Sequence, residues 1–305
     1  MSKINLSVDL GPLSLKNPVL TASGTFGYGL ELKDFCPPEK LGAVIAKGVS
    51  LTPWNGNPGP RLAETAGGML NAIGLENMGV EAFVEKALPP LKAVGATVAA
   101  NILGHSPEEY AGLSAKLART DVDLIEVNVS CPNVACGGLS FGARADSVYD
   151  VASAVKESCG DKPFMIKLTP QSSDVVEVAL AAERAGATAV SLINTIPAMA
   201  VDLERRRPKL ANRIGGLSGP AIKPVALRQV WECVKALRIP VVGIGGIFTA
   251  RDALEFILVG ATAVEVGTAT LIDPAAPLKI ITGIEEWMLK EGLDDLSQLR
   301  GTLKI

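Results

Sequence analysis

The sequence predicts a (β/α)8 barrel, because short apolar segments rich in β-branched residues alternate along it with amphipathic stretches. Repetition of strand and helix in this way requires a parallel sheet, and eight units favour closure over an open, doubly wound sheet. The 305 residues, of which 48% are hydrophobic, are enough for one such barrel. The predicted strands are Pro18–Ala22, Ala43–Val49, Thr97–Ile102, Leu124–Val129, Phe164–Leu168, Ala189–Ile193, Val241–Ile244 and Ala263–Val266.

The helices predicted between these strands carry the sequence signals of helix ends. Several begin with Ser or Thr ahead of Pro, Asp or Glu, which N-caps and first turns favour. Gly186 and Gly260 follow two of them, as expected for C-terminal stops. The predicted helices are Val80–Val94, Pro107–Ala118, Asp146–Ser158, Ser173–Ala185, Ile222–Leu237 and Ala250–Val259, with a last one through Pro277–Lys290.

Three segments outside the repeat complete the predicted architecture. Ile4–Leu10 and Leu13–Lys16 flank Gly11-Pro12 and predict an N-terminal β-hairpin that covers the bottom of the barrel. Long structureless connections are expected at Ser50–Gly79 and Thr195–Ala221, over the C-terminal face where barrel enzymes build their sites. No linker or low-complexity tract divides the chain, so residues 1–305 are expected to form a single domain.

Charge and hydrophobicity argue against two classes of partner. The formal net charge is -3, which gives no indication of a nucleic-acid or membrane-surface protein. No segment reaches the roughly 18 apolar residues of a membrane span, and the N-terminus lacks the apolar core of a signal peptide. We therefore expect a cytoplasmic protein with no membrane contact.

The cysteines and the single histidine restrict the chemistry further. Five scattered cysteines in a chain of this kind indicate free thiols rather than a disulfide framework. The spacing of Cys131 and Cys136 does not complete an iron–sulfur pattern, and no metal site is expected. His105 is the only histidine, so a catalytic triad or a multi-histidine metal site would depend on that one ring.

Polar side chains stand at the ends of most predicted strands. Barrel interiors prefer Val, Ile and Leu. Ammonium and amide groups that converge on one face are therefore better explained by a binding site than by core packing. The residues are Ser23, Lys47, Asn101, Asn128, Lys167 and the pair Asn194-Thr195, after strands one to six in order.

Glycines follow the last two strands, where barrels commonly hold a phosphate group. Gly243-Ile244-Gly245-Gly246 ends the seventh strand, Gly267-Thr268 ends the eighth, and Gly215–Gly219 adds a flexible segment. Flavin mononucleotide (FMN) fits a phosphate grip beside lysines and amides. Its ring needs amide partners, and a cation such as Lys167 near its N1–C2=O edge stabilises the negative charge gained on reduction.

Cys131 is the best available base in this set. The segment Leu124–Val127 predicts a buried strand, and the chain then enters a loop in which Cys131 lies between Ser130 and Pro132. An ordinary thiol has a pKa of about 8.5, so nearby lysines would increase its ionised fraction.

Five motifs then point to a family: Asn71–Leu75, Asn128–Asn133 (Asn-Val-Ser-Cys-Pro-Asn), Ile193–Thr195, Gly215–Gly219 and Gly243–Gly246. In combination, and over nearly the whole chain, they resemble dihydroorotate dehydrogenases, which oxidise dihydroorotate to orotate in pyrimidine biosynthesis. A catalytic cysteine without an N-terminal membrane helix is similar to class 1. The segments Gly68–Leu75 and Cys131–Gly138 resemble class 1B, which is NAD-linked.

The resemblance implies a division of labour between subunits. Class 1B enzymes pair an FMN-carrying barrel, expected as a homodimer, with a subunit that carries FAD and a [2Fe–2S] cluster, giving a heterotetramer that passes electrons to NAD. This chain would then bind one FMN and neither of the other two groups.

The resemblance also implies residue roles. Cys131 would take a proton from C5 of dihydroorotate while a hydride leaves C6 for the flavin, with Lys47 and Lys167 completing the catalytic set. The substrate-binding residues would be Lys47, Asn71, Ala72, Ile73, Gly74, Leu75, Asn128, Asn133, Asn194 and Thr195. The flavin-binding residues would be Ser23, Lys47, Gly48, Asn101, Asn128, Lys167, Ile193, Gly219, Gly245, Gly246, Gly267 and Thr268. No role for His105 is implied.

Four alternatives stay open at this point. One is a class 1A enzyme, which is linked to fumarate. A second is a pyrimidine-reducing flavin barrel such as the one in dihydropyrimidine dehydrogenase, which needs no carboxylate pocket. A third is a transfer-RNA dihydrouridine synthase, which needs a basic face. The fourth is a flavin-free, phosphate-binding barrel lyase or isomerase that uses Lys47 or Lys167 as its base or Schiff-base nucleophile.

Overall fold

Eight parallel strands form a barrel in the computed structural model, which describes residues 4–129, 141–172 and 174–305. In chain order they are β3 (Val19–Thr21), β4 (Val44–Ile45), β7 (Val98–Ile102), β8 (Leu124–Asn128), β9 (Phe164–Lys167), β10 (Ala189–Leu192), β15 (Val241–Ile244) and β16 (Ala263–Val266). Each pairs in parallel with the next, and a bridge between Leu20 and Ala43 joins the first to the second. The predicted (β/α)8 barrel and its eight strands are confirmed.

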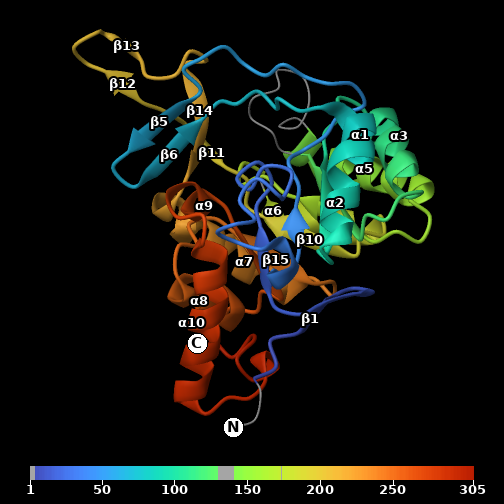
Figure 1. Ribbon diagram of the computed structural model, residues 1–305, viewed down its shortest axis with the longest axis vertical. Coiled ribbons are helices and arrows are strands. Elements are labelled where there is room, and N and C mark those ends of the chain that lie inside the picture. Colours follow the sequence, from blue (N-terminus) through green and yellow to red (C-terminus); the bar gives the residue numbers. More distant parts are fainter. Residues whose placement is uncertain (1–3, 130–140, 173) are drawn as a thin grey trace.

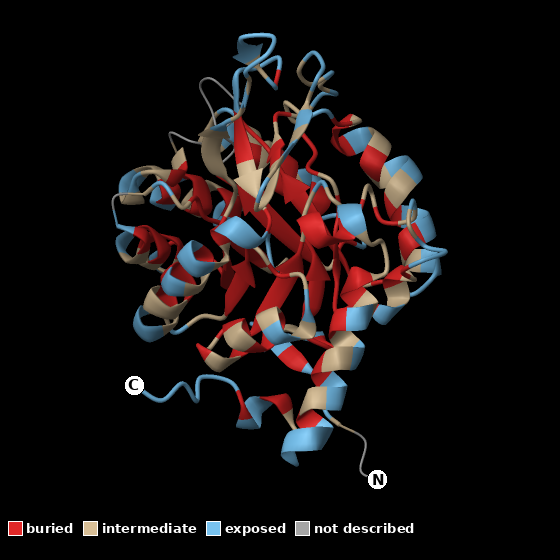
Figure 2. Cartoon of the chain, turned by 90° about the vertical axis from the view of Figure 1, so that its left-hand side faces the viewer, coloured by how far each residue is buried: buried red, intermediate tan, exposed pale blue. Residues whose placement is uncertain are grey.

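The strands are apolar because both of their faces are covered. All residues of the eight strands are buried, and the buried core runs through the middle of the molecule (Figure 2). Strands enclosed by helices on one side and by barrel packing on the other lose the alternating pattern of half-exposed strands. Near-continuous apolar runs in the sequence were therefore sufficient to identify the eight strands.

The helices surround the barrel, and their starts follow from local capping. They are α1 (Gly79–Ala82), the π-helical segment η2 (Phe83–Ala87), α2 (Leu88–Ala93), α3 (Pro107–Leu117), α5 (Ala145–Ser158), α6 (Val175–Arg184), α7 (Lys223–Ala236), α8 (Ala250–Leu258), α9 (Thr268–Ile272) and α10 (Ala276–Glu291). The Ser106 and Asp174 side chains accept hydrogen bonds from first-turn N–H groups of α3 and α6, and Thr249 and Asp252 form a capping box at α8.

Two helical features differ from the prediction. The helix predicted at Val80–Val94 contains the π-helical segment, because Pro89 and Pro90 cannot donate the backbone hydrogen bonds that a regular helix needs there. The short helix α9 was not predicted, since five residues directly after a strand carry no periodic signal.

The N-terminal hairpin closes the bottom of the barrel, as predicted. Strands β1 (Val8–Leu10) and β2 (Leu13–Leu15) pair antiparallel across a turn at Gly11, whose φ is +62°. Gly11 packs against Thr188, the residue before β10, so the hairpin lies at the amino ends of the barrel strands. Asn5, near the start of the described chain, forms a parallel bridge with Asp295, near its end.

The two long connections are not structureless, which corrects the prediction. Strands β5 (Leu62–Thr65) and β6 (Gly68–Asn71) of the first pair with β11 (Ile196–Met199) and β14 (Ile214–Ser218) of the second in a four-stranded antiparallel sheet of order β11-β14-β6-β5. A further pair, β12 (Val201–Asp202) and β13 (Arg207–Pro208), extends beyond it. This sheet stands over the carboxyl ends of the barrel strands (Figure 1).

Candidate active site

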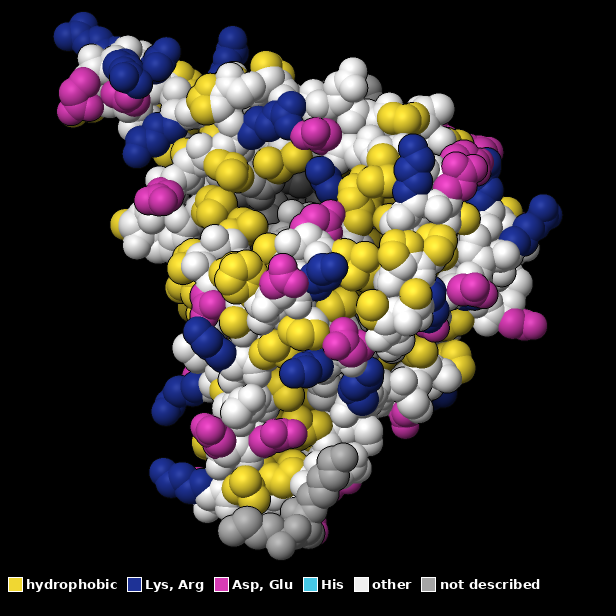
Figure 3. Space-filling view, viewed as in Figure 1, with side chains coloured by type: hydrophobic (Ala, Val, Ile, Leu, Met, Phe, Trp, Pro, Cys, Tyr) yellow, Lys and Arg dark blue, Asp and Glu magenta, His cyan; other side chains and the backbone are white. Residues whose placement is uncertain are grey.

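A cavity of about 380 Å³ lies between the barrel and the four-stranded sheet. Its opening is visible as a hollow in the upper half of the molecule (Figure 3). The wall is formed from the carboxyl ends of the barrel strands and from both long connections, the place where barrel enzymes hold their ligands. The volume falls within the range of about 300–1,000 Å³ that small-molecule sites occupy.

Most of the predicted site residues line this cavity. They are Ser23, Lys47, Gly48, Asn71, Ile73, Leu75, Asn101, Asn128, Lys167, Ile193, Asn194, Thr195, Gly219, Gly245, Gly246, Gly267 and Thr268. Two others do not reach the wall: Ala72 is buried beside Leu70 and Leu210, and Gly74 packs against Asn57. Cys131 and Asn133 lie outside the described residues.

A polar row at the ends of β8 and β10 forms one side of the cavity. The side-chain amide of Asn194 donates to Asn128 Oδ1 at 3.2 Å, and the hydroxyl of Tyr110 donates to the backbone carbonyl of Asn128 at 2.8 Å. The Thr195 N–H donates to Asn194 Oδ1 at 2.7 Å. Since each amide is fixed by a neighbour, the row can present donors and acceptors in set directions.

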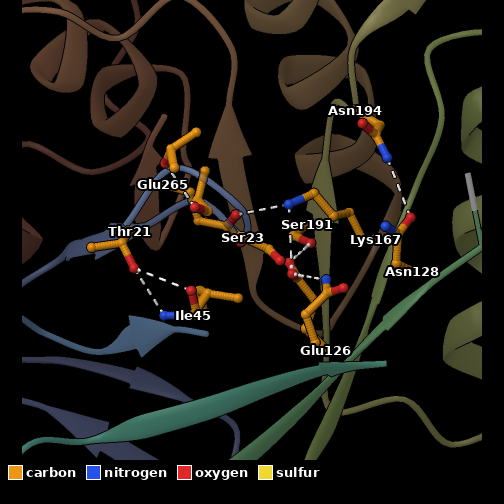
Figure 4. A network of polar contacts seen from close by, with 12 residues as sticks. Thr21, Ser23, Ile45, Glu126, Asn128, Lys167, Ser191, Asn194 and Glu265 are labelled. Atoms are coloured by element: carbon orange, nitrogen blue, oxygen red, sulfur yellow. Dashed lines mark hydrogen bonds and ion pairs between the residues drawn. The ribbon is translucent and has the colours of Figure 1, made fainter. Parts of the chain in front are cut away.

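Lys167 occupies the floor of the cavity and is held from below. Its ammonium lies 3.1 Å from Glu265 Oε2 and 3.5 Å from Glu126 Oε2 (Figure 4). Burial opposes the charge of Lys167, but the two glutamates outweigh it and raise the pKa of the lysine. The cavity therefore has a permanent cation in its floor at neutral pH.

Glu126 is the anion of this group. It accepts hydrogen bonds from Asn101 Nδ2 at 2.6 Å and from Ser191 Oγ at 2.8 Å. Burial opposes its ionisation, but the charge of Lys167 and these hydrogen bonds lower its pKa. For Glu265, burial followed by repulsion from Glu126 raises the pKa well above its usual value.

Glycines form a cradle at the opposite end of the cavity. Gly219, Gly245 and Gly246 all have positive φ values, of +96°, +124° and +72°. A Cβ on Gly246 would lie 2.6 Å from Lys223 Cβ, and one on Gly219 would lie 2.7 Å from Gly68 Cα, so no larger residue fits at either position. Helix α9 starts directly after Gly267, which matches the short extra helix after strand eight that holds phosphate in many barrels.

The four-stranded sheet brings Asn71 and Thr195 together over the cavity, although they are far apart in the sequence. Asn71 pairs with Gly216 in the β6–β14 ladder, and its side chain donates to the Gly216 carbonyl at 3.4 Å. A Cβ on Gly216 would lie 2.0 Å from Thr195 Oγ1. Close approach of the backbones therefore requires glycine in β14.

Some cavity residues were not predicted from the sequence. Arg61 and Glu76 form an ion pair at the mouth, and both also line the cavity. Glu126 and Glu265 lie inside the barrel below Lys167. The sequence did contain a signal for Glu126 and Glu265. Each is the single charged residue within a strand that is otherwise almost entirely apolar.

The thiols and the histidine that the structure describes lie away from the cavity. Cys36, Cys159 and Cys233 are free and buried, and burial raises the pKa of Cys36 to about 11 and that of Cys233 to about 12. Such thiols do not ionise near neutral pH. His105 stacks on Trp54, with ring centroids 4.8 Å apart, and does not line the cavity.

The described ranges contain neither a candidate membrane span nor a candidate metal site. No helix there combines the length and the apolar character that a bilayer span requires. Within the same ranges, no cluster of three or more His, Cys, Asp or Glu residues is arranged to hold a metal ion.

Comparison with known proteins places the chain in a family. The sequence profile described as "Dihydroorotate dehydrogenase" matches residues 5–288. A protein of Geotalea daltonii is 54% identical over all of both chains, and one of Trichlorobacter lovleyi is 53% identical over 98% of each. A protein of Alkaliphilus metalliredigens is 49% identical over 99% of this chain and all of its own. All three are named "Dihydroorotate dehydrogenase B (NAD(+)), catalytic subunit". The barrel, its cavity and these matches lead to one conclusion: the chain belongs to the dihydroorotate dehydrogenase family.

Proposed function

We propose that this chain oxidises dihydroorotate to orotate in pyrimidine biosynthesis, as the catalytic subunit of an NAD-linked dihydroorotate dehydrogenase, and that residues 1–305 form a single FMN-binding domain. The observation that carries the proposal is the composition of the cavity wall. Two lysines, four asparagines and a glycine cradle meet there around about 380 Å³. Full-length relatives with this enzyme's name support the reaction.

The residues present fit FMN. Gly219, Gly245 and Gly246 line the cavity with backbone in positive-φ conformations, and glycine-rich backbone of this kind suits a phosphate group. Asn101 Oδ1 lines the other end, is buried, and has no hydrogen-bond partner among the described residues. An acceptor in that state suits a ligand that brings its own N–H groups, as a flavin ring does.

The two ends of the cavity would then bind different parts of the cofactor. Gly219, Gly245, Gly246, Gly267 and Thr268 would hold the phosphate, with Ser23, Lys47, Gly48, Asn101, Asn128, Lys167 and Ile193 around the ring. FMN, when bound, supplies an acceptor for two electrons. Lys167, fixed by its two carboxyl partners, holds positive charge beside it.

Dihydroorotate, a small cyclic acid with polar groups around its ring, would bind under the four-stranded sheet. Lys47 would neutralise its carboxylate, and Asn71, Asn128, Asn194 and Thr195 would pair with the ring. The fixed hydrogen bond between Asn194 and Asn128 favours one orientation of the substrate. Ile73, Leu75 and Asn133 would complete the pocket, whereas Ala72 and Gly74 do not line the cavity.

The proton at C5 would go to Cys131, which follows Asn128 by three positions in the chain. The carbon–hydrogen bond at C5 breaks and its electrons form the double bond of orotate, while the hydrogen of C6 leaves with its electron pair. The thiolate takes the first proton and becomes a thiol. Each turnover thus places one proton on Sγ and two electrons on the acceptor.

The relatives are named as catalytic subunits, which implies that they work with a second subunit. For this chain we propose a homodimer that associates with a subunit carrying FAD and a [2Fe–2S] cluster, in a heterotetramer that delivers electrons to NAD. No nucleic acid is required.

The test is the visible spectrum of the purified chain, recorded without oxygen before and after addition of dihydroorotate. A flavin band that bleaches supports both cofactor and substrate. A flavin band that persists would shift the proposal to another pyrimidine. A colourless chain that FMN does not reconstitute would overturn it in favour of the flavin-free lyase. Reoxidation by the partner subunit with NAD, and not by fumarate, separates the NAD-linked from the fumarate-linked enzyme.

A further inference from the structure

Three charged side chains are buried among the described residues, and all three belong to one cluster. Glu126, Lys167 and Glu265 are at most 6% exposed, and they meet inside the barrel below the cavity (Figure 4). The other polar groups of the cluster, Asn101 and Ser191, are neutral and donate to Glu126. No other titratable group with a buried side chain is described in the barrel interior.

The charges in this cluster do not balance if every group carries its usual charge. One ammonium and two carboxylates give a net charge of −1 in a cluster that is almost entirely shielded from water. An uncompensated buried charge is costly, and such groups normally change their protonation state instead. Two carboxyl groups side by side commonly hold one proton between them for this reason.

The contacts indicate where the proton is needed. Glu126 is supplied with donors, from Asn101, Ser191 and Lys167. Glu265 Oε2 receives the Lys167 ammonium, whereas Glu265 Oε1 is buried with no hydrogen-bond partner among the described residues. An orphaned carboxyl oxygen of this kind is explained if it carries a proton that it donates to the neighbouring Glu126.

We propose that Glu126 and Glu265 are positioning residues that share one proton at neutral pH, and so hold Lys167 charged and fixed in the floor of the cavity within a cluster of zero net charge. The raised pKa of Glu265 and the lowered pKa of Glu126 agree with this state. The pair does not touch the substrate. It determines how much positive charge Lys167 presents to the ligand above.

The consequence for the reaction depends on the proposed function. A bound flavin would face an ammonium whose charge is already balanced by one carboxylate. Its reduction potential would therefore be lower than beside an uncompensated lysine, and higher than beside a doubly anionic pair.

The first test needs no flavin activity. Infrared difference spectra of the purified protein at neutral pH, in H2O and D2O, report the carbonyl stretch of a buried protonated carboxyl group. We expect one such band in the wild type and its loss in both Glu265→Gln and Glu126→Gln, because the remaining carboxylate then pairs with Lys167. Glu157→Gln, on the exposed side of α5, is the matched control and should retain the band. Absence of the band in the wild type would overturn the shared proton, and its persistence in Glu126→Gln would show that Glu265 is protonated independently.

The second test measures the midpoint potential of the flavin-loaded protein. Each single glutamine variant keeps the cluster neutral, so its potential should stay close to that of the wild type. If both carboxylates were ionised, each variant would instead shift the potential to a more positive value. The double variant leaves Lys167 without a counter-charge and should shift it positively, whereas equality with the wild type would show that the pair does not act on the cavity. A chain that binds no flavin would overturn the proposed function and leave the infrared result standing.

Discussion

The ammonium of Lys167 and a carboxyl oxygen of Glu265 lie 3.1 Å apart across the barrel interior, although β10 and β15 separate their strands in the sheet. The contact therefore joins two sides of the barrel through its centre. A side chain held in this way has little freedom to follow changes in the cavity above, which is what a fixed charge in an active site requires.

Replacement of Lys167 by methionine should destabilise the fold. The substitution leaves Glu126 and Glu265 buried without a cation, and loss of one partner from a buried ion pair typically costs about 3–5 kcal/mol. Urea denaturation at neutral pH measures the change. Lys290→Met, at an exposed position of α10, is the control and should stay within about 0.5 kcal/mol of the wild type. Equal stability of the two variants would mean that Lys167 does not compensate the carboxyl pair.

Glu265→Gln should change how stability depends on pH. The folded pKa of Glu265 is raised above the unfolded value of about 4.3, so between these values the folded protein binds more protons than the unfolded chain. The stabilisation from this group is complete below the unfolded pKa and is lost as pH rises through the folded pKa. The lowered pKa of Glu126 affects stability only at pH values below this range, and the raised pKa of Lys167 affects stability only at pH values above it.

The Glu265→Gln variant has no ionisable group at this position, so it does not lose this stabilisation as the pH rises. Its stability relative to the wild type should therefore increase by up to about 1.4 kcal/mol per pH unit within the window. Urea denaturation at several values between about pH 5 and pH 8 tests this. A difference between variant and wild type that is independent of pH would contradict a raised pKa for Glu265.

Gly246→Ala should weaken cofactor binding. Its φ of +72° disfavours any residue with a Cβ, and that Cβ would meet Lys223 Cβ at 2.6 Å. We expect a loss of about 1–3 kcal/mol of stability from backbone strain, and at least a tenfold weaker affinity for FMN, measured by flavin titration of the apoprotein. Gly160→Ala is the matched control, since φ there is +60° and the space for a Cβ is open. It should cost only the conformational strain and leave flavin affinity unchanged; equal affinities in the two variants would exclude the cradle as the phosphate site.

Cys131→Ser should retain the flavin but lose turnover of dihydroorotate by about 10²-fold or more, because a serine hydroxyl is a much weaker base than a thiolate. Rapid-mixing measurements of flavin reduction separate this step from reoxidation. In the wild type the rate should increase with pH toward the ordinary thiol pKa of about 8.5, and this dependence should vanish in the variant. Cys136→Ser is the control and should keep full activity. Near-normal turnover of the Cys131 variant would falsify the assignment of the base.

The sequence was a good guide to parts of the molecule where local pattern and three-dimensional position coincide. Lys47, Asn101 and Lys167 lie at the ends of buried strands, and in a parallel barrel all strand ends face one side, so they line one cavity. Gly245 and Gly246 were identified because the conformations they adopt are available almost only to glycine.

The sequence pattern could not predict pairings between segments that lie far apart in the chain. Strands β6 and β14 are short and glycine-rich, and each reads as a loop until the other is beside it. The same holds for Glu126 and Glu265, whose meaning depends on Lys167, contributed by a third strand. Each is a single carboxylate in an apolar strand, and only the folded barrel shows that the three meet.

The β6–β14 pairing also restricts how this cavity can change during evolution. A Cβ on Gly68 would lie 1.9 Å from the Ser218 carbonyl, so the two connections fit each other as closely as neighbouring strands of one hairpin. Exchange of either connection alone, by recombination or by loop grafting, would leave a strand edge without its partner and misplace Asn71 or Thr195. The two connections are therefore expected to be inherited together. A new ligand preference would arise through paired substitutions on both strands of the β6–β14 pair.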